Sequence, residues 1–164
     1  MNIPRNKTIQ ELFEWRFNKT PDLVAHKFQD RETTYGNLDK YSNQIANGLI
    51  SLNCKPDSRI AYYGKNSDHF FECLIGTLKS NTVTVGVNWR LAPPEVSYVL
   101  NDSQSEVLFV GKEFYPVIDQ ILDELPNIKT VIAIDGDSEK YQDFLSWRDS
   151  QDSSNPGLKS KKDD

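Results

Sequence analysis

Two short segments carry side chains that could bind a nucleotide. Asn88, Trp89 and Arg90 directly follow an apolar run that predicts a strand, and Lys112 follows the next such run. Open α/β sheets bind ligands at the carboxyl ends of their strands, so we expect all four residues at one edge of a sheet. An indole can stack on a base, and a guanidinium or ammonium can pair with phosphates. In the alternative interpretation, Trp89 packs on a neighbouring helix and Arg90 caps a carbonyl.

The segment Gly64-Lys65-Asn66-Ser67 lies between a predicted strand and a predicted helix. A helix N-terminus can bind an anion through its free N–H groups. Neither GxGxxG nor GxxxxGK[ST] is present, however. We interpret the segment as a plain turn in which Ser67 is the helix N-cap.

The histidines and the nearest carboxylate pairs do not indicate a catalytic site. His26 and His69 fit neither a Ser-His-Asp order nor a two-histidine helix motif, so we expect them to be structural or exposed. The carboxylate pairs lie in turn-like segments, where hydrogen bonding to the local backbone explains them better. These pairs are Asp102 with Glu106 and Asp135 with Asp137.

Strands and helices alternate in the elements that must position these residues. The predicted strands are Arg59–Tyr63, Thr82–Val87, Val107–Val110 and Thr130–Ile134. The predicted helices between them span about Ser67–Ser80, Pro93–Leu100 and Glu113–Leu125. This alternation predicts an α/β fold, with right-handed crossovers and a mostly parallel sheet covered by helices on both faces. Because Thr82–Val87 is β-branched at nearly every position, we expect it to be covered on both faces.

A helix and a small β-hairpin are expected before this sheet. Thr8 and Glu11 fit a capping box that opens a helix. Leu23–Gln29 is predicted as a strand, and Asp30-Arg31-Glu32 as a turn into a short second strand at Thr33-Thr34. A long helix from Tyr35 to Leu52 follows, with an apolar stripe along one side.

The C-terminal part is predicted to contain one more helix and a linker. The helix spans about Glu139–Trp147. From Asp149 on, only Leu158 is apolar, so this segment cannot offset the entropy cost of ordering. The predicted division is therefore an α/β subdomain over residues 1–148 and a disordered linker over residues 149–164.

Several motifs occur along the chain in a characteristic order. Thr33-Thr34-Tyr35-Gly36-Asn37-Leu38 is followed by Tyr63-Gly64-Lys65-Asn66-Ser67 and then by LKSNTVTVGVNWRLAPPEVSYVLNDSQSEVLFV. In order and spacing they resemble the first half of the AMP-forming acyl-CoA synthetases, the adenylate-forming ligases. The resemblance runs from about Thr8 to Ile134. It implies the fold of the first subdomain of such a ligase.

The resemblance also implies a reaction and its cofactors. In this family a carboxylate and ATP give an acyl-adenylate and pyrophosphate, and the thiol of CoA then gives acyl-CoA and AMP; Mg²⁺ accompanies ATP. The loops that correspond to Asn88–Arg90 and to Lys112 lie near the CoA nucleotide in relatives among the acetyl-CoA synthetases. Asn-Trp-Arg-Leu and its spacing are more similar to fatty- or medium-chain acyl-CoA ligases than to peptide-synthetase adenylation domains.

Several of the family's motifs have no counterpart in this sequence. These are the Thr/Ser/Gly-rich phosphate loop, the ribose-binding aspartate, the Gly-Arg-x-Asp hinge and the C-terminal catalytic lysine. We therefore expect an N-terminal piece of a ligase that is inactive by itself, with no catalytic or metal-binding residue and no tightly bound cofactor. Its partner would be the rest of the ligase, and a homodimer is left open. The alternative is a stand-alone, non-catalytic module that binds a nucleotide or a partner chain.

Composition limits the remaining classes. A chain of 164 residues predicts one domain, and a net charge of −5 argues against nucleic-acid binding. Cys73 lies in the apolar stretch HFFECLIG and is expected to be buried, and neither it nor Cys54 fits a CxxC spacing. No segment reaches the roughly 18 apolar residues of a membrane span, and the N-terminus lacks the apolar core of a signal peptide. The expected location is the cytoplasm.

Overall fold

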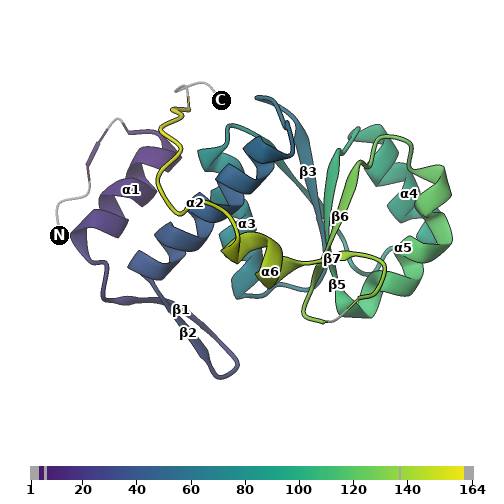
Figure 1. The fold of residues 1–164 in the computed structure, drawn as a ribbon, viewed down its shortest axis with the longest axis horizontal. Helices are drawn as coiled ribbons and strands as arrows, with labels where there is room; N and C mark the ends of the chain where they lie inside the picture. The colour runs from purple at the N-terminus through teal and green to yellow at the C-terminus, as the bar shows by residue number, and fades with distance from the viewer. Residues whose placement is uncertain (1–3, 6, 137, 161–164) are drawn as a thin grey trace.

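The chain folds into a five-stranded parallel sheet with helices on both faces and a small antiparallel hairpin to one side (Figure 1). The computed structural model describes residues 4–5, 7–136 and 138–160. The strands of the sheet are Arg59–Tyr63 (β3), Val83–Val87 (β4), Val107–Gly111 (β5), Thr130–Ile134 (β6) and Gln142–Asp143 (β7). Their order across the sheet is β4-β3-β5-β6-β7, and every neighbouring pair is parallel.

Three helices cover one face of the sheet. They are Tyr35–Ser51 (α2), Asp68–Lys79 (α3) and Phe144–Asp149 (α6). Side chains of β3, β5 and β6, such as Phe109 and Ile132, pack there against Ile45, Leu49 and Trp147. α2 and α3 therefore lie between the sheet and the N-terminal elements (Figure 1).

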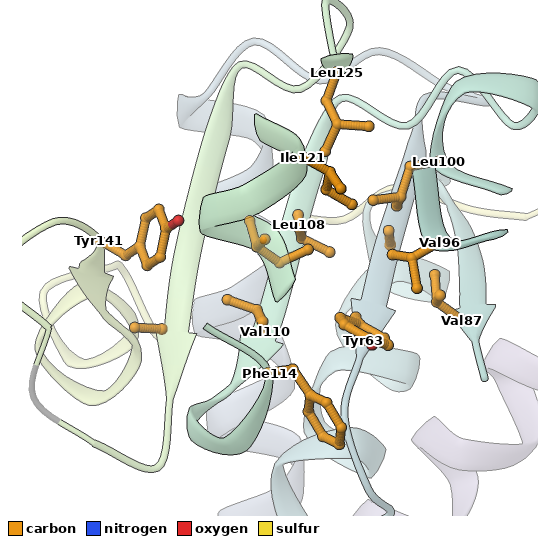
Figure 2. Packing of buried hydrophobic residues seen from close by; sticks show 13 residues of the cluster. Tyr63, Val87, Val96, Leu100, Leu108, Val110, Phe114, Ile121, Leu125 and Tyr141 are labelled. Atoms are coloured by element: carbon orange, nitrogen blue, oxygen red, sulfur yellow. The ribbon is translucent and has the colours of Figure 1, made fainter. Parts of the chain in front are cut away.

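The opposite face is covered by Pro93–Asp102 (α4) and Tyr115–Ile121 (α5), and short 3₁₀ turns at Lys112–Phe114 and Leu122–Glu124 flank α5. Figure 2 shows Leu108 and Val110 of β5 facing Val96 and Leu100 of α4 and Ile121 of α5. Since successive residues of a strand point to opposite faces, β5 supplies both cores and is apolar throughout.

The N-terminal elements form a third layer on α2 and α3. Helix α1 spans Ile9–Lys19, and the hairpin pairs Val24–Phe28 (β1) with Arg31–Thr34 (β2). The capping box at Thr8 is confirmed, because the Thr8 hydroxyl accepts from Glu11 N (3.2 Å) and the Glu11 carboxylate accepts from Thr8 N (2.9 Å). Phe17 of α1 packs with Leu38 of α2 and Ile75 of α3.

The predicted fold class is confirmed, and most element boundaries differ by only a few residues. Arg59–Tyr63 and Thr130–Ile134 match the observed strands, and the helix predicted from Tyr35 ends at Ser51. The helix predicted over Glu113–Leu125 is interrupted, since α5 occupies only its middle.

The prediction that Thr82–Val87 is covered on both faces is wrong. β4 is an edge strand, and Val83 is 42% exposed. Val87, at its carboxyl end, is buried under α4. β-Branched composition reports a preference for extended backbone and not the strand's place in the sheet.

Two predictions of local structure are also wrong. Residues Gln142–Asp143 pair with β6 as β7, so the last helix begins at Phe144 and not near Glu139. The Asp143 carboxylate accepts from Ser146 N (2.8 Å), and aspartate is a favoured N-cap. In the hairpin, Phe28 pairs with Arg31, so Arg31 and Glu32 belong to β2 and not to the turn.

The segment after α6 follows a defined path in the structure. Asp149 is the last residue of α6, and residues 150–160 then run across α2 to α1 (yellow in Figure 1). The prediction that residues 149–164 form a disordered linker concerns motion and stays a prediction; residues 161–164 lie outside the described part of the chain.

We predict that Gly76→Ala destabilises the fold even though alanine favours helices. A Cβ at Gly76 would lie 2.5 Å from Cγ2 of the fully buried Ile45, where α3 crosses α2. Overpacking costs about 1–3 kcal/mol, which outweighs the gain in helix propensity of about 1 kcal/mol. Urea unfolding measures the difference. Gly86→Ala is the control, because a Cβ there meets nothing within 4 Å; equal losses for the two variants would contradict the argument.

Candidate functional site

A crevice lies at the carboxyl edge of the sheet, where β3 and β5 are neighbours. The chain leaves β3 toward α3 on one face and leaves β5 toward α5 on the other. A parallel sheet opens between two loops that diverge in this way, and open α/β folds bind ligands at such points. A cavity of about 620 Å³ occupies this position, so the fold itself places the candidate site here.

Elements from distant parts of the sequence form the cavity walls. The hairpin contributes its tip, α3 and α6 contribute their first turns, and the loops after β3, β5 and β6 complete the lining. Among the lining residues are Phe28, Arg31, Lys65, Ser67, His69, Lys112, Phe114, Asp135 and Phe144. The mixture of rings and charges suits a ligand that carries both apolar and ionic groups.

The turn after β3 is the plain N-capping turn that the sequence predicts. The Ser67 hydroxyl accepts from Phe70 N (3.4 Å) and shares a hydrogen bond with the Tyr62 hydroxyl (3.1 Å). Tyr62 OH also donates to the Lys65 carbonyl (3.2 Å), and burial raises the pKa of this phenol. These contacts hold the loop closed at the cavity wall.

An ion pair attaches the hairpin to α3. Arg31 donates from Nε and Nη2 to the two carboxylate oxygens of Asp68, each at 2.7 Å. The Asp68 side chain is 4% exposed and that of Arg31 is 47% exposed. Burial alone would raise the pKa of Asp68, but the hydrogen bond from Arg31, together with the charges of His69 and Arg31, outweighs it, so the pKa lies below its usual value. A second pair, Lys65 with Glu113 (2.6 Å), joins the loops after β3 and β5.

A buried charged network lies behind the cavity. His69 is buried in the first turn of α3, and its Nδ1 lies 3.2 Å from Glu72 Oε2. Arg148 of α6 donates from Nη1 to the same Glu72 oxygen at 2.8 Å. The other ring nitrogen of His69 lies 3.8 Å from Asp135 Oδ1, and both residues line the cavity. His69 is thus structural, as predicted, but it also forms part of the wall.

Of the four residues predicted to bind a nucleotide, the structure places one in the cavity wall and three outside it. Lys112 lines the cavity, and its side chain lies against Gly136, where a Cβ would come within 2.6 Å of Lys112 Cδ. Asn88, Trp89 and Arg90 are exposed outside the cavity lining. The Asn88 side chain accepts from Arg90 N (3.0 Å), and the Arg90 guanidinium lies over the Trp89 ring at 4.2 Å.

The Trp89 ring nevertheless lies close to two residues that line the cavity. It lies 6.5 Å from the ring of Phe114, and Lys65 Nζ lies 5.4 Å from its centroid. Both of these partners line the cavity. Trp89 and Lys112 therefore belong to one carboxyl-edge surface, as the strand pattern predicted.

Sequence reasoning missed Arg31, Glu72 and Arg148. Arg31 was assigned to a turn, and the other two are 76 residues apart. One signal was available, because Glu72 is a charged residue within the apolar stretch HFFECLIG and lies one helical turn from His69.

The described residues offer no other evident chemistry. They contain no group of three or more His, Cys, Asp or Glu side chains that could hold a metal ion. Cys73 is buried, as predicted, and burial raises the pKa of its thiol; Cys54 is also a free cysteine. No helix in this part of the chain is long and apolar enough to cross a membrane. Of the carboxylate pair at the turn after β6, Asp137 lies outside the described residues.

Comparison with known proteins identifies the family. The family described as AMP-binding enzyme matches residues 13–164. The chain belongs to this family. Fatty acid–[acyl-carrier-protein] ligase ScoC of Streptomyces coeruleorubidus is 37% identical over 95% of the chain, which spans 28% of that protein. A medium/long-chain-fatty-acid–CoA/3-oxocholest-4-en-26-oate–CoA ligase of Mycolicibacterium smegmatis is 28% identical over 83% of the chain, which spans 25% of it.

Solved ligases of the family share the fold. The anthranilate CoA ligase AuaEII, solved with anthranoyl-AMP, superposes on 99% of the chain with a TM-score of 0.87 and 26% identity. The N-terminal domain of FACL13 from Mycobacterium tuberculosis superposes on 94% of the chain with a TM-score of 0.84 and 30% identity. The chain covers 32% and 39% of these structures, so it corresponds to the N-terminal part of a ligase of this family.

We predict that the Arg31–Asp68 pair makes stability depend on pH on the acid side. The pKa of Asp68 is lowered by folding, so the pair stabilises fully above the unfolded value of about 3.9 and its contribution is lost as the pH falls through the lower folded value. Asp68→Asn should therefore be less stable than the wild type at pH 6, and the gap should close toward pH 2. Urea unfolding across this range tests it, with the exposed Asp57→Asn as control. A gap that stays constant with pH would contradict the prediction.

Proposed function

We propose that this chain is the N-terminal part of an ATP-dependent, AMP-forming ligase that activates a fatty or medium-chain carboxylic acid. The similarity to ScoC carries the proposal, because this relative is named for a fatty-acid ligation and matches nearly the whole chain. The mycobacterial relatives, named for medium- and long-chain fatty acids, support the same acyl class. In the proposed reaction the acid and ATP give an acyl-adenylate and pyrophosphate, and a thiol then displaces AMP.

Within this proposal the chain contributes residues that bind CoA, the thiol substrate of the second half-reaction. CoA carries an adenine ring and phosphates, and the carboxyl edge offers an exposed indole at Trp89 and cations at Arg90 and Lys112. Lys112 lines the cavity, and its ammonium group would pair there with a phosphate of CoA. Asn88 would hold the loop, since it bonds to Arg90 N.

ATP and Mg²⁺ are assigned to the downstream part of the ligase. The sequence has no counterpart of the family's phosphate loop or catalytic lysine, and the described residues hold no metal-binding cluster. The proposed partners are accordingly the remaining subdomains and the carboxylic acid. The proposed location is the cytoplasm, and a homodimer remains part of the hypothesis.

The acceptor thiol has a second candidate. ScoC is named for transfer to an acyl-carrier protein, whereas the mycobacterial relatives are named for CoA. We place CoA first because the aromatic and cationic groups at this edge match a nucleotide. An assay of the longer protein with CoA and with holo-acyl-carrier protein as alternative acceptors distinguishes the two.

We predict that Lys112→Ala in the longer protein raises KM for CoA about fivefold, since an exposed ion pair contributes on the order of 1 kcal/mol. The rate of acid-dependent ATP–pyrophosphate exchange should not change, because that half-reaction takes place before the thiol binds. Lys55→Ala is the matched control, since Lys55 is exposed just before β3, at the amino edge of the sheet. An unchanged KM for CoA would contradict the assignment of Lys112.

We further predict that residues 1–164 alone release no pyrophosphate from ATP, Mg²⁺ and a panel of fatty acids. Adenylyl transfer requires positioned phosphate ligands, and these motifs are missing from the sequence. Turnover above the enzyme-free rate would refute this.

The DNA downstream of the Asp164 codon separates the alternatives: an open frame with a Thr/Ser/Gly-rich loop supports the ligase, and a stop codon supports a stand-alone, non-catalytic module.

A further inference from the structure

Residues 150–160 lie on a surface built from side-chain amides. Four residues of α1 and α2 donate to main-chain carbonyls of this segment, which we call the strap. Asn43 donates to Ser153 O (3.0 Å), Asn47 to Asp152 O and Ser154 O (both 2.8 Å), Gln44 to Gln151 O (3.3 Å) and Gln10 to Leu158 O (2.7 Å). The contacts therefore follow the strap along most of its length.

The amide of Gln10 pairs with the strap as a neighbouring strand would. Its Nε2 donates to Leu158 O at 2.7 Å, and its Oε1 accepts from Ser160 N at 2.9 Å. In an extended chain the C=O of one residue and the N–H two residues later point to the same side. The Gln10 carboxamide occupies both groups at once, and the side chain is 4% exposed.

A hydrogen bond from Lys79 of α3 determines how the Asn43 amide is oriented. Buried Lys79 donates to Asn43 Oδ1 at 2.6 Å. An ammonium group only donates, so the amide oxygen must face Lys79 and the NH₂ group must face the strap. Asn43 and Gln10 are both buried, and water cannot satisfy their amides as long as the strap covers them.

We propose that the amides of α1 and α2 form a docking surface for main-chain groups, and that its occupant is this chain's own segment 150–160. The surface binds the strap through its main-chain carbonyl and N–H groups, and the strap's side chains from Asp152 to Asn155 are exposed. In this proposal the strap is an ordered part of the fold, in place of the disordered linker that the sequence predicts.

Isosteric substitutions test the proposal. Asn43→Asp together with Asn47→Asp keeps the acceptor for Lys79 but replaces three donated hydrogen bonds with carboxylates that face carbonyls. The charge-matched control is Asn18→Asp with Asn37→Asp, because both of these residues are exposed and contact no strap residue in the described structure. Backbone ¹⁵N relaxation on residues 1–164 measures the order parameters of the strap.

In the wild type and in the control variant, residues 151–158 should have order parameters close to those of the helices, roughly 0.85, whereas in the Asn43/Asn47 variant they should fall below about 0.6. Unchanged chemical shifts of the sheet amides show that the variant keeps its fold. If these shifts change, Gln10→Ala replaces the double variant, and loss of order is then expected at residues 158–160. Values below about 0.6 in the wild type, or no change in the variant, would overturn the proposal. Neither measurement depends on ligase activity.

Discussion

The buried ion pair between Glu72 and Arg148 is the interaction on which both the crevice and the C-terminal path depend. The two side chains are 2% and 6% exposed. Arg148 also donates to the exposed Asp149 (2.8 Å), so Glu72 is the charge that cannot turn to water if its arginine is removed. Removing one partner of such a pair costs about 3–5 kcal/mol, which is a large fraction of a domain's stability. α6 must therefore stay against α3. This contact orients His69 at the cavity wall, and it also sets where residue 150 emerges beside Gln44.

Helix α2 connects the layers of the molecule. Its residues 42–46 are all buried, although a helix buried on every side is usually apolar. Ile45 contacts the sheet side, while Asn43 and Gln44 face polar partners. Lys79 of α3 donates hydrogen bonds to two oxygens of α2, the Asn43 side-chain oxygen and the main-chain carbonyl of Asp39 (3.2 Å). Burial lowers the pKa of Lys79, and the carboxylate of Asp39 opposes that effect. The layers are thus joined by polar contacts whose partners lie far apart in the sequence.

The sequence predicted those parts of the structure that depend on local pattern. The strands of the sheet center, the capping box at Thr8 and the N-cap at Ser67 follow from periodicity and short-range hydrogen bonding. The order of motifs identified the family correctly. Periodicity could not show that β4 lies at an edge, because a strand's neighbours are set by the crossovers. It also could not pair Arg31 with Asp68, since that contact arises only when the hairpin folds back onto α3. Lys112 and Trp89 were placed at the right edge of the sheet, but the lining of the cavity by the hairpin had no sequence signal.

The contacts between α2 and the segment after α6 have an evolutionary consequence. Donors on Asn43 and Asn47 meet carbonyl oxygens, which every amino acid possesses, and the side chains of residues 152–155 point to solvent. Many mutations in that segment can therefore accumulate with little penalty, provided that its length and backbone path are kept. Gly157, whose φ is +73°, and Asp152, whose carboxylate accepts from Ser154 N, are exceptions. Mutations at the two asparagines are not interchangeable in this way, because Asn47 donates to two carbonyls and Asn43 both donates to the segment and accepts from Lys79. Selection would then preserve the receiving helix while the received segment drifts, and alignments of orthologues would show a variable stretch that is nevertheless structurally constrained.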